Sequence, residues 1–187
     1  PAAKVLVVAV ELCTLHFQKE YTEDNLLANS LFGDGAAAAL VMRSDQGLVI
    51  KNYLSQILRE GEKDMAWGIG DFGFEMRLSQ YIPSLLDQGI HKLKGAFEAK
   101  FGLSQITQFA IHPGGKQILQ KVQEAFRLPP EVNRHSMDVL KNHGNMSSVS
   151  ILFVLDKMMN DDNVQGNLLA MGFGPGLTLE TLLLDKR

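Results

Sequence analysis

The chain has 187 residues, of which 45% are hydrophobic and 21% are charged, and its formal net charge is −3 at pH 7. This size suits one domain with a complete hydrophobic core. The slightly acidic balance and the lack of long basic runs argue against nucleic acid as a partner. The apolar runs are far shorter than the roughly 20 residues that a membrane span needs, so no membrane association is predicted. Cys13 is the only cysteine, which excludes an internal disulfide and fits a reducing, cytoplasmic environment.

Three apolar runs in the first third of the chain predict strands, at residues 3–12, 36–44 and 47–58. The first two are rich in β-branched residues or alanine without polar alternation, which predicts strands buried on both faces. Between them, residues 21–32 predict a helix with Thr22 as its N-cap and acidic residues in its first turn. The polar, glycine-rich stretch 59–75 is expected to be irregular.

The remaining chain alternates helical and strand patterns. A helix is predicted to begin at Pro83, which suits the first helical position. Residues 106–112 predict a short strand, and 167–184 hold two apolar runs around a glycine-rich bend. Further helices are predicted at 115–126, 137–141 and 145–159. Strands that alternate with helices and end in a strand pair indicate a layered α/β sheet.

The segment AIHPGGKQIL places His112 at the end of a predicted strand. Pro113 disfavours a helical conformation at His112, and the two following glycines let another backbone approach. Functional sites of open α/β sheets lie where strand ends face helix N-termini. A histidine in such a place can equally be a packed or solvated residue, so the motif alone leaves both interpretations open.

Asn145, in KNHGNMSSVS, lies at a predicted helix start. The simplest interpretation is an N-cap, which asparagine serves well. Ser147 and Ser148 follow two and three positions later and are also suitable caps, which leaves Asn145 available for a ligand. In the last third, GFGPGLT surrounds Pro175 with glycines, which predicts a stiff bend beside a pocket or a plain hairpin turn.

Together these segments resemble the C-terminal half of a chalcone synthase-like type III polyketide synthase, of the thiolase superfamily. The resemblance rests on ELCTLHF, SLFGDGAAAALV, IHPGGKQIL, NHGNMSS and GFGPGLTLET, which occur in the family's order and spacing. It implies an α/β, thiolase-like layered fold with a mixed sheet covered by helices. Residues 1–20 would hold the last strand of the N-terminal half, and 21–187 the C-terminal domain.

The family's catalytic triad is Cys-His-Asn, and the resemblance places its histidine at His112 and its asparagine at Asn145. The nucleophilic cysteine is expected upstream of this chain, because Cys13 corresponds to a pocket wall. Phe32 and Phe74 correspond to gates of the cavity, and Lys116 replaces a proline of plant members, which suggests a bacterial-type member. The resemblance implies substrate-binding positions at Cys13, His16, Phe32, Gly33, Phe74, Ser147 and Pro175.

The implied reaction is acyl transfer: an acyl group passes from coenzyme A to cysteine and is then extended by decarboxylation of malonyl-CoA. His112 would lower the thiol pKa, and His112 and Asn145 would stabilise the enolate. Asparagine suits this role because it donates without titrating. The resemblance implies acyl-CoA and malonyl-CoA as substrates, no metal and no organic cofactor, and a homodimer. The chain alone is expected to be inactive.

Two alternatives remain at this stage. A ketoacyl synthase of fatty-acid initiation shares the triad, but it typically carries His-Gln-Ala-Asn and a triple glycine where this chain has HPGG and GFGPG. Pro113 and Pro175 therefore favour the polyketide synthase. A non-catalytic module with the thiolase fold is the second alternative.

Overall fold

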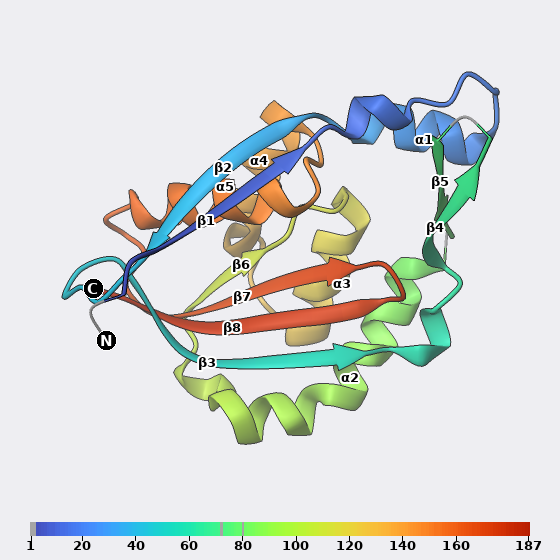
Figure 1. Ribbon diagram of the computed structural model, residues 1–187. Coiled ribbons are helices and arrows are strands. Elements are labelled where there is room, and N and C mark those ends of the chain that lie inside the picture. Colours follow the sequence, from blue (N-terminus) through green and yellow to red (C-terminus); the bar gives the residue numbers. More distant parts are fainter. Residues whose placement is uncertain (1–2, 72, 80) are drawn as a thin grey trace.

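The computed structural model describes residues 3–71, 73–79 and 81–187 (Figure 1). The strands are β1 (Val5–Glu11), β2 (Gly35–Val41), β3 (Leu48–Ile57), β4 (Met65–Gly70), β5 (Gly73–Leu78), β6 (Gln108–Ile111), β7 (Gly166–Gly174) and β8 (Thr178–Lys186). The helices are α1 (Glu23–Leu31), α2 (Ile82–Phe101), α3 (Lys116–Phe126), α4 (Arg134–His143) and α5 (Ser148–Met159). Short 3-10 turns lie at Cys13–His16, Arg59–Gly61, Leu103–Gln105 and Pro130–Asn133.

A mixed four-stranded sheet forms the centre of the molecule, in the order β3-β8-β7-β6. Strand β6 runs parallel to β7, while β7 and β8 form an antiparallel hairpin and β3 pairs antiparallel with β8. Strands β1 and β2 form a separate antiparallel ribbon. The predicted mixed sheet and its helical cover are therefore confirmed.

Helices cover both faces of the central sheet (Figure 1). On one face, α2 and α3 bury Phe97, Leu119 and Val122 against Leu169 and Met171 of β7. On the other face lie α4 and α5. Their buried residues pack against alternate residues of the same strands, namely Ala110, Leu168 and Ala170. The alternation follows from the two-residue period of a strand.

Helix α5 lies between the sheet and the ribbon of β1 and β2. Val149 and Val154 of α5 belong to the core cluster that contains Ala170 of the sheet, and Ala9 and Ala37 of the ribbon pack against this cluster. A helix with sheets on two sides needs apolar residues around most of its surface, and the sequence of α5 has them. None of the helices in the described ranges is long and apolar enough to cross a membrane.

The ends of several helices agree with their sequence signals. Thr22 caps α1, because its Oγ1 accepts a 3.1 Å hydrogen bond from the N–H of Asn25. Helix α2 begins at Ile82, one residue before the predicted Pro83, and ends at Phe101. It is followed by Gly102, whose φ of 63° is left-handed. Such a residue closes a helix most easily when it is glycine.

The prediction that residues 59–75 are irregular is wrong over much of its length. Strands β4 and β5 form an antiparallel hairpin whose register runs from Met65 opposite Leu78 to Gly70 opposite Gly73. Gly73 has a φ of 128°, which a tight turn tolerates only at glycine. Backbone pairing holds this hairpin, and the side chain of Ile69 is 91% exposed. Such a strand has no apolar pattern by which the sequence could reveal it.

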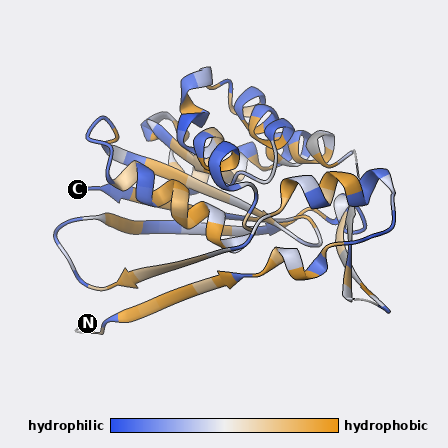
Figure 2. Ribbon diagram, turned by 90° about the horizontal axis from the view of Figure 1, so that it is seen from above, coloured by the Kyte–Doolittle hydropathy of each residue, from blue (hydrophilic) through white to orange (hydrophobic). Residues whose placement is uncertain are grey.

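The prediction that the first two strands are buried on both faces is also wrong for this chain. Val8 and Val10 are about 60% exposed, and Leu6 is similarly exposed. Figure 2 shows β1 as a strongly apolar strand at the periphery of the molecule. The β-branched composition predicted the strand correctly, but no second layer lies over its outer face in the described structure.

Candidate active site

His112 directly follows Ile111, the last residue of β6. Its N–H donates a 2.8 Å hydrogen bond to the carbonyl oxygen of Met171 and so continues the pairing of β6 with β7. The hydroxyl of Ser136, on α4, donates to the Ile111 carbonyl oxygen at 2.6 Å. The N–H of Gly114 donates to the His112 carbonyl oxygen, which closes a tight turn. The backbone on both sides of His112 is therefore fixed.

His112 is only 9% exposed. Burial lowers its pKa from the ordinary 6.5 to about 4, because the charged form loses hydration. At neutral pH the ring is therefore uncharged, with one nitrogen as donor and the other as acceptor. An imidazolium at this position requires a compensating anion next to it.

Asn145 lies in an irregular segment that is held in place by backbone hydrogen bonds. Its N–H donates to the Leu31 carbonyl oxygen at 2.8 Å, and its carbonyl oxygen accepts from the N–H of Gly33 at 3.0 Å. These bonds form an isolated parallel bridge between Asn145 and Phe32. The two segments lie so close that a Cβ atom on Gly33 would be 2.9 Å from the carbonyl oxygen of His143.

The carboxamide of Asn145 has a defined orientation. Its Oδ1 accepts a 2.9 Å hydrogen bond from the N–H of Ser147, and its Nδ2 donates to the Gly114 carbonyl oxygen at 3.4 Å. Since Oδ1 is engaged by a backbone donor, the amino group must occupy the other position. The amino group therefore lies on the side of the turn that follows His112.

The prediction that a helix begins at Asn145 is wrong. Helix α5 begins at Ser148, and Ser147 precedes it with a φ of 50°, which is unusual for a residue other than glycine. Asn145 therefore closes a turn ahead of the helix and is not its N-cap. The local sequence could not reveal this, because the bridge to Leu31 and Gly33 determines the backbone here.

One pocket of about 80 Å³, called here the His112 pocket, brings His112 and Asn145 together. Its described lining residues are Phe32, Met65, His112, Gly114, Ile118, Asn145, Ser147, Phe173, Gly174 and Pro175. The sequence analysis predicted three of these residues as part of the site, namely Phe32, Ser147 and Pro175. Two more lie in the glycine-rich motifs HPGG and GFGPG, namely Gly114 and Gly174. Met65 and Ile118 have no sequence signal, because they reach the pocket only through the fold.

Cys13 and His16 line a different hollow of about 40 Å³, called here the Cys13 pocket. Phe32 lines both pockets. Burial, together with the nearby carboxylates of Glu11 and Asp34, raises the pKa of the Cys13 thiol. Cys13 is therefore a protonated thiol at neutral pH and does not border the His112 pocket.

Gly33 and Phe74 are not among the described residues that line either pocket. Gly33 serves the backbone bridge described above. Phe74, on β5, is 46% exposed, and its ring contacts that of His16 with centroids 5.2 Å apart. The Nε2 atom of Gln18 also donates to the Phe74 carbonyl oxygen. The β4–β5 hairpin therefore contacts the wall of the Cys13 pocket.

Two side chains that line the His112 pocket, those of His112 after β6 and Asn145 before α5, can donate hydrogen bonds to a ligand. A neutral imidazole and a carboxamide can both stabilise negative charge on an oxygen without changing their own charge. No group of three or more His, Cys, Asp or Glu side chains within the described ranges is arranged to hold a metal ion.

The family model for the C-terminal domain of chalcone and stilbene synthases matches residues 49–186. The chain therefore belongs to the chalcone synthase-like type III polyketide synthases, which have the thiolase fold. An alpha-pyrone synthesis polyketide synthase-like protein of Mycobacterium tuberculosis is 32% identical over 99% of this chain and 50% of its own length.

Solved structures agree with this assignment. The 1,3,6,8-tetrahydroxynaphthalene synthase of Streptomyces coelicolor matches with a TM-score of 0.92 and 29% identity, over 100% of this chain and 55% of its own. The C-terminal type III domain of a type I/III hybrid polyketide synthase from Dictyostelium matches with a TM-score of 0.90 and 28% identity, over 98% and 54%. The chain spans about half the length of these relatives.

Proposed function

We propose that this chain is part of an acyltransferase that condenses an acyl-CoA starter with malonyl-CoA by decarboxylative Claisen condensation. The single observation that carries the proposal is that His112 and Asn145 line one pocket. The carboxamide orientation adds support, because the bond from the Ser147 N–H leaves the amino group as the part that meets a ligand. Membership of the type III polyketide synthases makes this chemistry the natural candidate.

In this mechanism a cysteine thiolate attacks the starter thioester, and coenzyme A leaves as its thiol. Malonyl-CoA then loses carbon dioxide, and the electron pair of the broken bond passes to the thioester as an enolate. His112 and Asn145 donate hydrogen bonds to the enolate oxygen, and each such donor contributes roughly 3–4 kcal/mol. The enolate carbon attacks the acyl group and expels the cysteine thiolate. No metal or organic cofactor is required.

The nucleophilic cysteine is proposed to lie in another part of a longer protein. Cys13 is unsuited, because its pKa is raised and it lines the other pocket. The described His112 pocket, at about 80 Å³, is also far smaller than the roughly 300–1,000 Å³ of typical ligand sites. Additional walls are therefore needed. We propose that they cover the exposed face of β1 and β2 and that the complete enzyme is a homodimer.

The substrate cavity would include the positions inferred from the resemblance. Phe32, which lines both pockets, and Phe74, on the adjacent hairpin, are proposed as gates. Cys13 and His16 would border the growing acyl chain, and Ser147 and Pro175 the reacting thioester. Gly33 would contribute through the backbone bridge to Asn145.

The decisive test is Asn145→Asp in the full-length enzyme, assayed for malonyl-CoA decarboxylation. The carboxylate repels the enolate and cannot donate, so decarboxylation should be abolished while the protein still folds. Asn52→Asp, a partly exposed site on β3, makes the same chemical change away from the pocket and should retain activity. Near-normal decarboxylation by Asn145→Asp would remove Asn145 from the mechanism.

Two further assays separate the alternatives. Type III enzymes accept malonyl-CoA directly, so dependence on an acyl carrier protein would favour a ketoacyl synthase. The 187-residue chain alone should form no ketide from acyl-CoA and malonyl-CoA. Measurable product from it would disprove the proposal that the nucleophile lies elsewhere.

A further inference from the structure

The N-terminus of α5 is capped from a distant part of the chain. Ser147, in the N-cap position, makes no side-chain cap hydrogen bond. Instead, Oε1 of Glu11, the last residue of β1, accepts hydrogen bonds from the Ser148 N–H at 3.2 Å and from the Ser148 Oγ at 2.5 Å. Glu11 and Ser148 are 137 positions apart in the sequence. The contact therefore joins the outer ribbon to the inner helix layer.

The chemistry of this contact suits a strong cap. The first N–H groups of a helix lack intrahelical partners and carry partial positive charge. A carboxylate that accepts from them forms hydrogen bonds stronger than those between neutral groups. The other nearby carboxylate, Asp34, is engaged by the N–H and Oγ1 of Thr14. Glu11 is thus the carboxylate that serves α5.

The capped turn is continuous with the carboxamide of Asn145. Ser148 is fixed by Glu11, and its neighbour Ser147 donates its N–H to Oδ1 of Asn145. Ser147 has a φ of 50°, a conformation that its surroundings must hold in place. If the first turn of α5 frayed, the Ser147 N–H would move away from Oδ1. The carboxamide could then rotate and present its oxygen, not its amino group, to the pocket.

We propose that Glu11 is a positioning residue for Asn145. Glu11 is not among the described residues that line the Cys13 pocket or the His112 pocket. It therefore acts through the start of α5 and not on the substrate. This inference rests on the proposed role of Asn145 in stabilising an enolate. It predicts that Glu11 controls the rate of malonyl-CoA decarboxylation and leaves substrate affinity nearly unchanged.

The test compares Glu11→Ala and Glu11→Gln in the full-length enzyme. Alanine removes the cap, so kcat for decarboxylation should fall about tenfold or more, while KM stays within about twofold. Glutamine keeps an oxygen that accepts both bonds, so it should restore most of the rate. Acylation of the nucleophile by acyl-CoA does not use the Asn145 donor and should remain within about twofold of the wild-type rate.

A double variant identifies the route of the effect. If Glu11 acts through Asn145, Glu11→Ala should slow decarboxylation little further in an Asn145→Ala background. Independent, multiplicative losses would overturn the proposal, as would a wild-type rate for Glu11→Ala. Equal losses of acylation and decarboxylation would also overturn it, because a general structural defect affects both.

Hydrogen exchange tests the same contact without any assay of activity. Amides at 147–150 should exchange faster in Glu11→Ala than in the wild type. The matched control Glu62→Ala, at an exposed position in a turn, should leave them unchanged. If the wild type does not decarboxylate malonyl-CoA, the proposed function fails, and unchanged exchange in Glu11→Ala would separately overturn the cap.

Discussion

The hydroxyl of Ser136, on α4, donates a 2.6 Å hydrogen bond to the carbonyl oxygen of Ile111, the residue that precedes His112. Ser136 is 1% exposed, so the bond lies in the core. Strand β6 has its partner β7 on one side, and this bond attaches the end of β6 to the helix layer as well. His112 therefore extends from a backbone that is held from two directions.

Ser136→Ala should destabilise the protein by about 1–3 kcal/mol, because the Ile111 carbonyl oxygen is left buried without this donor. Urea unfolding measures the change in the free energy of unfolding. Ser55→Ala is a suitable control, since Ser55 donates to Glu180 at an exposed site, and its effect should stay within about 0.5 kcal/mol. Equal effects of the two substitutions would contradict the importance of the buried bond.

Gly33→Ala should be strongly destabilising and should reduce decarboxylation in the full-length enzyme. The new Cβ atom would lie 2.9 Å from the backbone oxygen of His143, so the bridge that holds Asn145 must open. Gly95→Ala in α2 is the matched control, because no atom lies within 4 Å of the added Cβ. Alanine there should stabilise the helix by up to about 1 kcal/mol. If Gly33→Ala changed neither the melting temperature nor the rate of decarboxylation, this prediction would be refuted.

The buried, neutral state of His112 predicts a pH dependence of stability. The pKa is about 4 in the folded chain and near 6.5 when exposed, so between these values only the unfolded state binds the proton. Stability should therefore fall as the pH drops from about 6.5 to about 4, by roughly 3 kcal/mol from this residue. His112→Gln should flatten that part of the profile. An NMR titration midpoint of His112 near 6.5 would refute the prediction.

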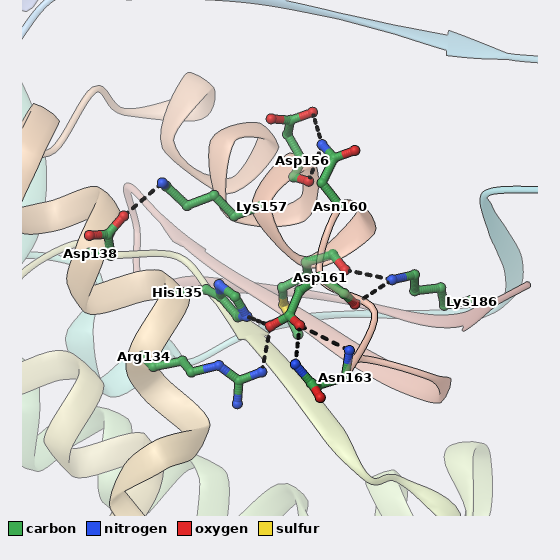
Figure 3. A network of polar contacts seen from close by, with 10 residues as sticks. Arg134, His135, Asp138, Asp156, Lys157, Asn160, Asp161, Asn163 and Lys186 are labelled. Carbon is green, nitrogen blue, oxygen red and sulfur yellow. Dashed lines mark hydrogen bonds and ion pairs between the residues drawn. The ribbon is translucent and has the colours of Figure 1, made fainter.

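Asp161 anchors the chain just after α5 (Figure 3). Its carboxylate accepts hydrogen bonds from Arg134, at 2.7 Å, and from the backbone and side chain of Asn163, both at 2.9 Å. Nε2 of His135 lies 3.0 Å from the same carboxylate. Lys186 donates to the Asp161 carbonyl oxygen at 2.7 Å. Helix α4, strand β8 and the end of α5 therefore meet at this residue.

The hydrogen bond from Arg134, followed by those from the backbone and side chain of Asn163, holds the pKa of Asp161 well below its usual range. The ionised form therefore favours the folded state, and its contribution is complete above the unfolded pKa of about 3.9 and is lost as the pH falls below it. Asp161→Asn should lower the melting temperature at pH 7, and the difference from the wild type should shrink below pH 4. A difference that is constant with pH would contradict this assignment.

Sequence patterns predicted those features that depend on neighbouring residues. The strand that ends before His112, the cap at Thr22 and the strand pair around Pro175 all have local signals, and the structure has each of them. The start of α5 was mispredicted because the backbone of Asn145 pairs with a segment more than 100 positions earlier. The β4–β5 hairpin was missed because its glycines and exposed side chains carry no apolar period.

The layered arrangement also determines how the molecule should come apart. The β1–β2 ribbon buries much less than the central sheet does, so we expect it to open at a lower free energy. Its opening withdraws Glu11 from α5, while the β6–β7 pairing that fixes His112 stays intact. Mild denaturant would thus release the Asn145 carboxamide from its fixed orientation before it displaces the His112 imidazole. The His112 pocket would then lose one hydrogen-bond donor while most of the chain is still folded.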